Sequence, residues 1–420
     1  GLLLTVRLGV LQFRKLGLAL RYMVKNEKDG VGEVTSFGAL CTALSATVGT
    51  GNIVGVAGAM LAGGPGAVFW MFIAACIGMA TKYAEGLLAV KYRVIDKEGH
   101  ALGGPFYYIE RGMGRNWKWL AKIFAFFGVG AGLLGIGTIT QVNGISTAVN
   151  NFADPNGAHI AFTMNGIGYT WATLVTAVVV AAAVALVVIG GIKRIAKVSE
   201  IVVPFMAVLY VAAALLVIIC NITKVPTAIV EIVQSAFGMR AAAGGALGAI
   251  IMAMQKGIAR GIFSNEAGLG SAPIAAAAAQ VEDPAGQGLV SMMGTVIDTL
   301  VICTLTGLTI VITGAWNVGL EGVAVTTKAF QDGMPFPGEI ASFILMVSLV
   351  FFAFTTILGW NYYSERCLAI FIGPYMTVSA VWTIADIFNG LMALPNLVAL
   401  VALNGVVVSE TKKYFEKLKK

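Results

Sequence analysis

Two stretches of this sequence interrupt apolar segments with glycines and polar residues. They are Ser45-Ala46-Thr47-Val48-Gly49-Thr50-Gly51-Asn52 and Gly261-Ile262-Phe263-Ser264-Asn265-Glu266-Ala267-Gly268-Leu269-Gly270. A helix that breaks in an apolar medium leaves backbone N–H and C=O groups without partners, which costs several kcal/mol per group. The free N–H groups at the start of a half-helix suit a carboxylate, and the free carbonyls at the end of one suit a cation or an ammonium group. A pair of such breaks can therefore hold both ends of a zwitterion.

Glycines in membrane helices can also serve only to let helices approach each other closely. For scattered glycines such as Gly128, Gly132 and Gly135 this interpretation is preferred. It explains the two interruptions less well, because close packing does not require the polar residues that stand there. Those residues are Asn52, Ser264, Asn265 and Glu266.

The composition requires a bilayer as solvent. Hydrophobic residues make up 58% of the 420 positions and charged residues only 12%, whereas soluble domains carry about 25% charge. The formal net charge of +7 comes from basic residues in short connectors. Since no basic face with interleaved aromatic residues is present, we expect no nucleic-acid partner. The sequence predicts a multi-spanning membrane protein that contacts the lipid bilayer.

The sequence lacks the common signatures of enzymes and of nucleotide-driven pumps. It contains no HExxH helix, no Ser/His pairing, no His/Cys metal cluster and no GxxxxGK[ST] loop, and its five cysteines stand singly in apolar runs. His100 and His159 are both expected in loops. We therefore expect no enzymatic activity, no cofactor and no obligatory protein partner.

Apolar runs of the roughly 20 residues needed to cross a bilayer define the expected elements. They cover about 34–63, 65–92, 118–148, 167–190, 195–221, 245–279, 286–315, 336–368 and 389–408. A shorter apolar run at 375–388 is expected to be a tenth span. Two further pieces, about 8–26 and 226–239, are expected to be amphipathic surface helices.

Each interruption lies in the span that opens a set of five spans. Because five is odd, the two sets run in opposite directions through the membrane, which is typical of inverted repeats whose broken helices form a site at the midplane. We assign the first repeat to 31–221 and the second to 245–408. The remaining segments are an amphipathic, clipped N-terminal segment at 1–30, an extracellular connector helix at 222–244 and a basic cytoplasmic tail at 409–420.

The distribution of lysine and arginine predicts the orientation. Basic residues are dense before the first span, between the second and third, between the fourth and fifth, and in the tail, and they are sparse in the alternate loops. We therefore expect a cell-membrane protein with a cytoplasmic C-terminus. Gly1–Val6 has the character of the end of a hydrophobic segment, so a preceding apolar helix is expected.

Four motifs, in this order along the chain, resemble signatures of the alanine or glycine:cation symporter family, within the amino acid–polyamine–organocation superfamily. They are Ala46-Thr47-Val48-Gly49-Thr50-Gly51-Asn52-Ile53, Gly103-Gly104-Pro105-Phe106-Tyr107-Tyr108, Gly261-Ile262-Phe263-Ser264-Asn265-Glu266-Ala267-Gly268 and Asp386-Ile387-Phe388-Asn389-Gly390-Leu391-Met392-Ala393-Leu394-Pro395-Asn396. The resemblance covers nearly the whole chain.

The resemblance implies an all-α integral membrane protein with the five-plus-five inverted-repeat fold of the bacterial leucine transporter, in which the first and sixth core helices are discontinuous. It also implies secondary active import of alanine and glycine, coupled to sodium by alternating access. The sequence departs from the family in two places. From the resemblance, one further N-terminal helix is expected before residue 1, and the ninth core helix, over 370–388, is expected to be shorter than is usual in the family.

The physics of the breaks and the resemblance together give the expected substrate contacts. The substrate carboxylate is expected at the N–H groups around Thr50, Gly51 and Asn52, and the ammonium at carbonyls near Phe263 and Ser264. Gln141 is expected either to hydrogen-bond the substrate or to make only an interhelical bond. Phe263 and Trp360 are expected to wall the pocket and to leave room only for a small side chain. The full substrate set is Thr50, Gly51, Asn52, Gln141, Phe263, Ser264, Asn265 and Trp360.

The expected cation site also follows from the resemblance. Thr355 and Thr356 resemble the paired hydroxyls that hold sodium in this fold, with backbone carbonyls near Ser45 and Val48 as partners. Hard oxygen ligands without thiol or imidazole suit an alkali cation. The alternative is that both hydroxyls bond only to carbonyls of the preceding turn, as threonine in membrane helices often does.

Charged residues expected at membrane depth are candidates for ion coupling. Glu266 and Asp298 could serve a cation site, carry a proton, or only brace the broken helices. Lys256 and Arg260 could neutralise a carboxylate or form a gate directed toward the cytoplasm. Proton coupling therefore stays open beside sodium coupling. A passive facilitator or channel is the less favoured alternative, because the sequence shows no row of hydroxyl or charged residues along one helix face, as a pore would need.

Overall fold

The structure, a computed structural model, describes residues 1–24, 30–95, 97, 100–134, 137–164, 166–239, 245–361 and 391–418. The predicted span at 375–388 lies outside these residues.

Six helices of the described chain are long and apolar enough to cross a membrane, and two bent pairs pass the same test. The six are α6 (Gly66–Lys91), α10 (Trp171–Val188), α11 (Gly191–Cys220), α13 (Ala246–Asn265), α18 (Gly338–Asn361) and the continuous run Pro284–Thr313. That run consists of α15 (Pro284–Thr295), the π-helical η5 (Val296–Cys303) and α16 (Thr304–Thr313). These helices agree with the predicted runs, and the all-helical membrane fold is confirmed.

Each of the two bent pairs has the length and hydropathy of one span if its two helices are taken together. In the first, α4 (Ser36–Thr47) meets Gly51–Gly63, which comprises the π-helical η1 (Gly51–Gly55) and α5 (Val56–Gly63), at an angle of 53°. In the second, Leu391–Ala402 meets α21 (Asn404–Lys417) at 58°. The first break falls where the sequence predicted it, whereas the bend near Leu403 was not predicted.

The third predicted span, 118–148, is two helices, α8 (Lys118–Leu134) and α9 (Ile139–Ala153). Gly137 lies between them. A Cβ atom on Gly137 would be 2.7 Å from Cβ of Trp360, so this interruption lets the Trp360 side chain approach the backbone.

Shorter elements connect the long helices. Near the N-terminus lie α1 (Leu2–Arg7), α2 (Leu11–Arg14) and α3 (Leu16–Val24), and after α6 come β1 (Val94–Ile95), β2 (Ala101–Leu102), α7 (Pro105–Tyr108), η2 (Ile109–Met113) and η3 (Arg115–Trp117). Further along are β3 (Ile160–Met164), β4 (Ile167–Thr170), η4 (Ile222–Lys224), α12 (Val225–Ala236), α14 (Ala272–Ala276), η6 (Ala315–Asn317) and α17 (Val323–Gly333). Both strand pairs, β1–β2 and β3–β4, are antiparallel.

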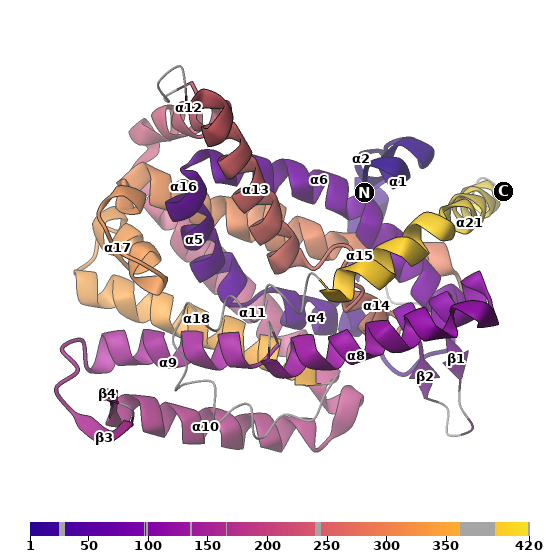
Figure 1. Ribbon diagram of the computed structural model, residues 1–420, viewed down its shortest axis with the longest axis horizontal. Coiled ribbons are helices and arrows are strands. Elements are labelled where there is room, and N and C mark those ends of the chain that lie inside the picture. The colour runs from indigo at the N-terminus through magenta and orange to yellow at the C-terminus, as the bar shows by residue number, and fades with distance from the viewer. Residues whose placement is uncertain are drawn as a thin grey trace.

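The long helices run between two ends of the molecule, which Figure 1 shows at left and right. The left-hand end carries α12, α17 and the β3–β4 hairpin, and the right-hand end carries both termini, the β1–β2 hairpin and α21 (Figure 1). We call them the α17 end and the α21 end. Helix α12 buries Ala228 and Ala236 and exposes Ile229 and Val230, as expected for an amphipathic surface helix.

The helices at the periphery expose large apolar side chains that a soluble protein would bury. On α10 and α11 these include Val178, Leu186, Ile201, Phe205 and Val208, each more than half exposed. Such a surface fits contact with lipid. The buried polar residues, in contrast, concentrate on α4, η1, α13, η5 and α18 at the centre of the bundle.

At the α21 end, the segment before α4 is tied to the segment after α14. Backbone bridges join Val31 to Val281 and Val34 to Ala279. The guanidinium of Arg93, just beyond α6, donates hydrogen bonds to the carbonyls of Ala277, Ala279, Val31 and Val281, at 2.5–3.0 Å. We call this arrangement the Arg93 clamp.

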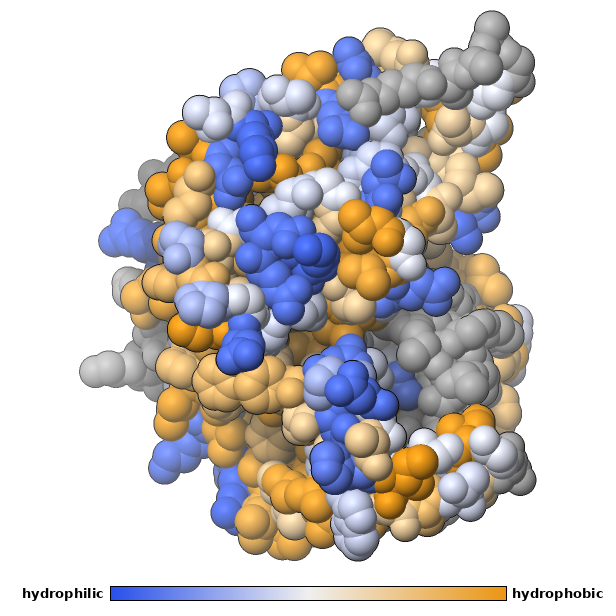
Figure 2. All heavy atoms as spheres, turned by 90° about the vertical axis from the view of Figure 1, so that its left-hand side faces the viewer, coloured by the Kyte–Doolittle hydropathy of each residue, from blue (hydrophilic) through white to orange (hydrophobic). Residues whose placement is uncertain are grey.

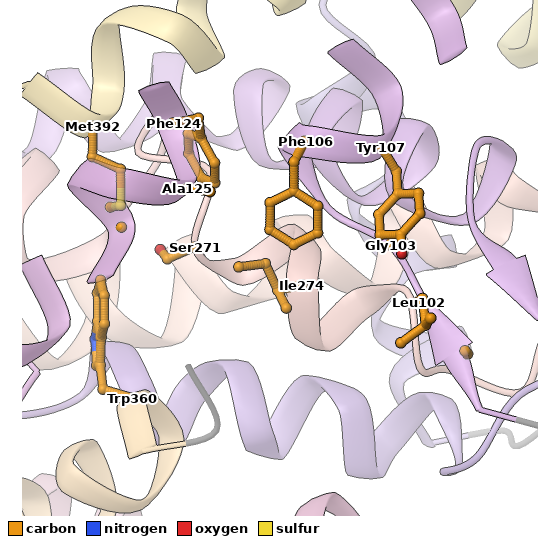
Figure 3. A pocket seen from close by; sticks show the side chains of 12 residues that line it. Leu102, Gly103, Phe106, Tyr107, Phe124, Ala125, Ser271, Ile274, Trp360 and Met392 are labelled. Atoms are coloured by element: carbon orange, nitrogen blue, oxygen red, sulfur yellow. The ribbon is translucent and has the colours of Figure 1, made fainter. Parts of the chain in front are cut away.

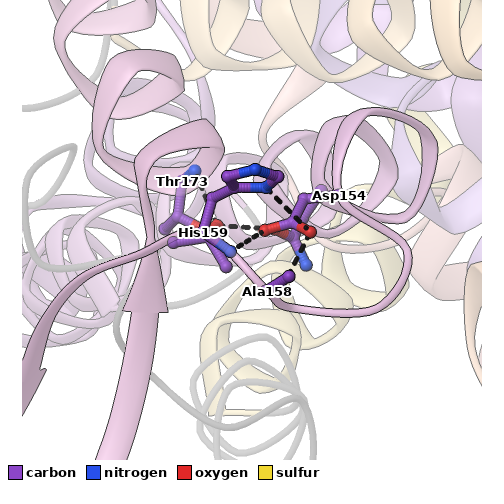
Figure 4. A network of polar contacts seen from close by, with 6 residues as sticks. Asp154, Ala158, His159 and Thr173 are labelled. Atoms are coloured by element: carbon purple, nitrogen blue, oxygen red, sulfur yellow. Dashed lines mark hydrogen bonds and ion pairs between the residues drawn. The ribbon is translucent and has the colours of Figure 1, made fainter.

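At the α17 end, the turn after α9 is ordered by one carboxylate (Figure 4). Asp154 accepts hydrogen bonds from the backbone N–H groups of Ala158 and His159, each at 2.9 Å, and the His159 ring lies 3.5 Å away. These bonds, led by the one from the His159 N–H, hold the pKa of Asp154 below its usual value. His159 is thus a turn residue, as the sequence predicted.

Candidate functional site

The first break is built around Asn52. Helix α4 ends at Thr47 and Val48 is extended. The Gly49 N–H then donates to Oδ1 of Asn52 at 2.8 Å, so the side chain caps the restarting half-helix. A Cβ atom on Gly49 would lie 2.4 Å from Oγ1 of Thr356. Glycine is therefore needed here for the close approach of α18.

The second break turns on Glu266. Helix α13 ends at Asn265, and Glu266 adopts a left-handed conformation with φ of 57°. Such a backbone is uncommon for a residue other than glycine and requires support from its surroundings. The support comes from the side chains around it. The Trp360 indole N–H donates to Oε1 of Glu266 at 2.8 Å, and the Ser271 hydroxyl donates to Oε2.

The two breaks lie against each other at the centre of the bundle. A Cβ atom on Gly51 would be 3.5 Å from both the Phe263 ring and Cα of Ser264. Asp298 in η5 joins the breaks, because its Oδ1 accepts from Nδ2 of Asn52 at 2.7 Å and its Oδ2 from the Ser264 hydroxyl at 2.9 Å. All these polar groups are almost completely buried. The structure thus brings together residues predicted separately for substrate and for ion coupling.

The N–H of Thr50, expected to meet a substrate carboxylate, already has a partner. It donates to Oε1 of Gln141 at 3.0 Å. Gln141 lies in α9, and Thr50 stands at the start of the second half-helix. The structure therefore shows the interhelical bond that was one of the two roles foreseen for Gln141. Its role as a substrate ligand stays a prediction.

The predicted cation residues are only partly assembled. The Thr356 hydroxyl lies 3.2 Å from the Val48 carbonyl and 3.0 Å from the Phe352 carbonyl, and its one hydrogen is shared between these two acceptors. The Thr355 hydroxyl lies 3.0 Å from the carbonyls of its own helix at Phe351 and Phe352, and the Ser45 hydroxyl donates to the Thr42 carbonyl. Thr356 thus reaches the first break, while the Thr355 hydroxyl makes the local bonds of the alternative interpretation. The prediction for Ser45 concerns its backbone carbonyl, which the bond of its hydroxyl does not test.

Sequence reasoning missed a second buried polar cluster, which contacts the Gly268 backbone and consists of Glu85, Asn396 and Tyr108. Oε1 of Glu85, in α6, accepts from Nδ2 of Asn396 at 2.6 Å and from the Gly268 N–H at 3.2 Å. Tyr108 in turn donates to Oδ1 of Asn396. Glu85 and Lys82 are 1% and 2% exposed in the middle of α6. Charged residues one turn apart inside an apolar span were the signal that could have identified them.

Trp360 faces a large cavity on the far side of the breaks (Figure 3). The cavity has a volume of about 400 Å³ and a mainly apolar lining that includes Phe106, Phe124, Ser271 and Met392. Phe263 is not part of this lining. The structure therefore places Trp360 between the second break, which it contacts through Glu266, and the cavity. That both rings wall the substrate pocket stays a prediction.

Lys256 and Arg260, predicted either to neutralise a carboxylate or to form a gate directed toward the cytoplasm, both lie in α13. Both precede the break in α13, in the half that packs against α5 and the start of α6. They therefore lie toward the α17 end, opposite α21. The Arg260 guanidinium stands over the Phe263 ring, 5.4 Å from its centroid, a cation–π arrangement.

Two discontinuous helices that meet around buried polar groups, in a helical membrane protein, define the class of secondary transporters with the five-plus-five inverted repeat. The crystal structure of MhsT in complex with L-phenylalanine has the same fold. The alignment covers 90% of this chain and 86% of the MhsT chain, with a TM-score of 0.55 and a sequence identity of 15%.

The chain belongs to the sodium:alanine symporter family, which it matches over residues 1–420. It is 44% identical to the sodium/alanine symporter AgcS of Methanococcus maripaludis, over 99% of this chain and 92% of that protein. It is 39% identical to the probable sodium/glutamine symporter GlnT of Bacillus subtilis, over 99% of this chain and 86% of that protein. An uncharacterised transporter of Haemophilus influenzae is 53% identical over the whole chain. The protein is thus a multi-pass membrane transporter of an amino-acid symporter family, and not an enzyme.

Proposed function

We propose that this protein imports small neutral amino acids, chiefly alanine and glycine, in symport with sodium by alternating access. The observation that carries the proposal is the contact of Thr356 with Val48. It sets a hydroxyl of α18 against the Val48 carbonyl at the first break, close in the chain to the N–H group of Thr50. A cation and a carboxylate bound at these neighbouring groups would each favour the other, which is the basis of coupling.

The substrate carboxylate would replace the Gln141 oxygen on the Thr50 N–H. Gln141 could then present its amide N–H₂ to the same carboxylate, which would give the buried substrate oxygen a second donor. The ammonium would meet carbonyls at the end of α13 near Phe263 and Ser264, with Asn265 next to them. This arrangement uses the start of one half-helix and the end of the other, as the partial charges of helix ends favour.

The size of the substrate would be limited by Phe263. A Cβ atom on Gly51 would lie 3.5 Å from Cδ1 of the Phe263 ring, which is van der Waals contact. The Phe263 side chain itself is 5% exposed. A hydrogen or methyl side chain would fit such a space better than a longer one. GlnT bears a name that includes glutamine, so glutamine is the substrate to compare with alanine and glycine.

The cation would use the Val48 and Ser45 carbonyls with the hydroxyls of Thr355 and Thr356, all hard oxygen ligands. The carboxylate of Asp298, held between Asn52 and Ser264, would supply negative charge nearby. Proton coupling through Glu266 or Asp298 is the second candidate, because both carboxyl groups are fully buried at the breaks.

The proposed orientation places the α21 end in the cytoplasm of a cell-membrane protein. This end carries the basic residues of α3, of the connector after α6 and of α21, which the positive-inside rule assigns to the cytoplasmic side. The 400 Å³ cavity that Trp360 lines would then belong to the route of substrate release.

The test is uptake of labelled alanine, glycine and glutamine by proteoliposomes under an inward sodium gradient, with a potassium gradient as control. We expect sodium-dependent accumulation of alanine and glycine, lost in Thr355→Ala/Thr356→Ala. Between the single variants, Thr356→Ala should raise the sodium concentration for half-maximal uptake more than Thr355→Ala, and Thr356→Ser should restore it.

Equal uptake in sodium and potassium would contradict sodium coupling. A pH gradient applied to Glu266→Gln and Asp298→Asn would then test the proton alternative. Downhill equilibration without accumulation would instead favour a facilitator.

A further inference from the structure

Lys82 is a buried charge to which the proposed function gives no role. It lies in the middle of α6 and is 2% exposed. A charged side chain is costly at membrane depth, and one that is kept there indicates a function. Helix α6 packs against α4, α14 and α15 (Figure 1), and residues of these three helices surround a small cavity at Lys82. Lys82 therefore stands between α4, which leads into the first break, and α14, which follows the second.

Three buried carboxylates lie at the breaks or against them, those of Glu85, Glu266 and Asp298. The hydrogen-bond donors that the structure gives them are neutral. They are Asn396 and the Gly268 N–H for Glu85, Trp360 and Ser271 for Glu266, and Asn52, Ser264 and Thr299 for Asp298. Among the described residues, the ammonium of Lys82 is a positive charge that acts on all three carboxylates.

The charge of this ammonium is not cancelled by a carboxylate in direct contact. No ion pair of Lys82 is found in the described part of the chain. The cavity beside it measures about 10 Å³, and its polar lining consists of Lys82, Thr47, Gln287 and Ser291. Oε1 of Gln287 is buried, and no described residue donates to it. A cavity of this size suits one water molecule, which could accept from the ammonium and donate to Oε1 of Gln287. Such a partner leaves the positive charge intact.

A cation that binds near Asp298 enters the field of this ammonium. Like charges repel each other, and the repulsion extends further in the interior of a protein than in water. On the surface of the α17 end, where Figure 2 shows hydrophilic side chains gathered, water and salt screen the exposed charges. Lys82 is shielded from both. Its ammonium therefore opposes the same cation that the Asp298 carboxylate attracts.

We propose that Lys82 is a built-in competitor of the sodium ion, which offsets part of the negative charge at the breaks and keeps sodium binding weak enough for release. A symporter must release each ion that it has bound, on the side where the ion is to be delivered. Three buried carboxylates without a positive charge would hold a cation tightly and slow that step. This inference rests on the proposed function, because sodium is the coupling ion of that proposal.

The sign of the effect distinguishes this role from a structural one. If Lys82 only stabilised the fold, replacing it by a neutral residue would lower stability and would weaken sodium binding or leave it unchanged. Competition predicts the opposite, which is tighter sodium binding in the absence of the ammonium. Lys82 would act through the field at the cation and not as a ligand, so it is a positioning residue of the cation site.

The first experiment measures sodium binding in detergent without transport. A ligand that binds the folded protein raises its melting temperature, and the rise with sodium concentration gives a dissociation constant. We expect this constant to be about three- to tenfold lower in Lys82→Gln than in the wild type. Lys91→Gln is the matched control. Lys91 lies at the end of the same helix and is paired with Glu410, so its loss should leave sodium binding unchanged.

A second variant keeps the lysine and changes the charge beside it. Gln287→Glu is nearly isosteric and places a carboxylate on the cavity that Lys82 lines. The new carboxylate would cancel much of the field of the ammonium, so the sodium dissociation constant should fall about two- to fivefold. Gln287→Met removes the polar group without adding a charge and should behave like the wild type. If Lys82→Gln does not fold, Gln287→Glu decides the matter alone.

The second experiment measures alanine uptake by proteoliposomes against sodium concentration. The sodium concentration for half-maximal uptake should fall about three- to tenfold in Lys82→Gln, and the maximal rate should fall with it because sodium leaves more slowly. Lys91→Gln should match the wild type in both.

The outcomes separate this proposal from the proposed function. Sodium binding that is unchanged or weaker in Lys82→Gln, or an equal change in Lys91→Gln, would overturn the competition while leaving sodium symport intact. An unchanged dissociation constant in Gln287→Glu would also overturn it, because charge at this cavity would then not reach the cation. The absence of any sodium effect, in wild type and variants alike, would contradict sodium coupling and the competition together. Tighter sodium binding in Lys82→Gln without sodium-driven uptake would keep the competition and contradict the symport.

Discussion

At the scale of single residues, Asp298 is hydrogen-bonded to both broken helices, at residues predicted to contact the substrate. Its carboxylate accepts from Asn52 of the first break, from Ser264 of the second and from the Thr299 hydroxyl at 2.6 Å. Three donors satisfy much of its hydrogen-bonding capacity but supply no positive charge. The buried ammonium of Lys82 acts on this carboxylate from α6. A cation bound nearer to Asp298 would be stabilised further by its charge.

Asp298→Asn is predicted to separate the role of the charge from that of the hydrogen bonds. The amide is isosteric and keeps an acceptor for Asn52, so folding should survive. If the charge holds the cation, the sodium concentration for half-maximal uptake should rise about ten- to hundredfold, which corresponds to the roughly 1.5–3 kcal/mol of a hydrogen bond or contact to a charged group. Sodium dependence of alanine uptake is the measurement.

Cys303→Ala is the control for this change. Sγ of Cys303 lies 3.3 Å from both Nδ2 of Asn52 and Oγ of Ser264. The thiol contacts the same two residues as Asp298 but is not a proposed source of negative charge for the cation. Its loss should therefore leave the sodium dependence nearly as in the wild type. If Asp298→Asn also behaves like the wild type, Asp298 only braces the breaks.

Asp154 gives a pH-dependent prediction outside the membrane. Because its pKa is lower in the folded protein than in the unfolded chain, its contribution to stability is complete above the unfolded pKa of about 3.9. It is lost as the pH falls through the lower folded value. Melting temperatures in detergent should therefore be higher for the wild type than for Asp154→Asn at pH 6, and the two should converge as the pH drops below about 4.

Asp332→Asn serves as the comparison for Asp154. Asp332 pairs with Lys328 across one turn of α17, and both side chains are 41% exposed, so its replacement should change the melting temperature little. A constant difference between wild type and Asp154→Asn at all pH values would contradict the assigned role.

At the scale of elements, the close approach of α18 to α4 sets the geometry of the proposed cation site. A Cβ atom on Gly359 would lie 2.7 Å from the backbone N of Ala46 and 2.8 Å from its Cα. Backbone atoms cannot move aside as the end of a flexible side chain can. Gly359→Ala should therefore push α18 away from the first break and separate Thr356 from Val48.

We predict that Gly359→Ala lowers stability by about 1–3 kcal/mol, as overpacking typically does, and raises the sodium concentration for half-maximal uptake. Gly58→Ala in α5 is the matched control. Nothing lies within 4 Å of the added Cβ there, so it should be neutral or stabilising by up to about 1 kcal/mol. Unfolding in detergent and sodium-dependent uptake measure both effects. Equal behaviour of the two variants would show that α18 can shift without consequence.

The long elements could be predicted from the sequence because apolar runs and their polar interruptions are local signals. The breaks at Thr47 and Asn265 fall within the motifs that predicted them. The interruption between α8 and α9 could not be predicted, because it depends on Trp360, more than 200 positions away in the sequence. The short α17, with Lys328 and Asp332 on its surface, lacks the length and hydropathy of a span and was missed.

The candidate site was predicted as a set of positions but not as a set of contacts. Polar residues in apolar runs identified Asn52, Ser264 and Asp298, whereas their meeting at one carboxylate depends on how three helices pack. Glu85 was missed for a different reason. It lies in α6, which is continuous. A search limited to helices broken by glycines and polar residues therefore does not find it.

At the scale of the whole molecule, alternating access requires each end to open while the other is closed. The Arg93 clamp holds three segments together at the α21 end: the segment before α4, the end of α6 and the segment after α14. A guanidinium can donate to four carbonyls from its planar fork, which an ammonium on a flexible stem cannot match. The clamp should therefore favour the state in which this end is closed.

Arg93→Lys is predicted to shift the population toward a state open at the α21 end, while the charge is kept. The carbonyls that lose a partner should cost about 1–3 kcal/mol, measured by unfolding in detergent. The native Cys41 reports on the opening, because it lies in α4 and is 1% exposed in the clamped structure. Its labelling by a thiol reagent should become faster in Arg93→Lys, relative to the exposed Cys220, and should stay unchanged in Arg111→Lys, an exposed arginine of the same end. Because the clamp is remote from the breaks, kcat for alanine should change more than KM. A Cys41 labelling rate that is the same in all three proteins would mean that the clamp fixes the fold at this end and takes no part in its opening.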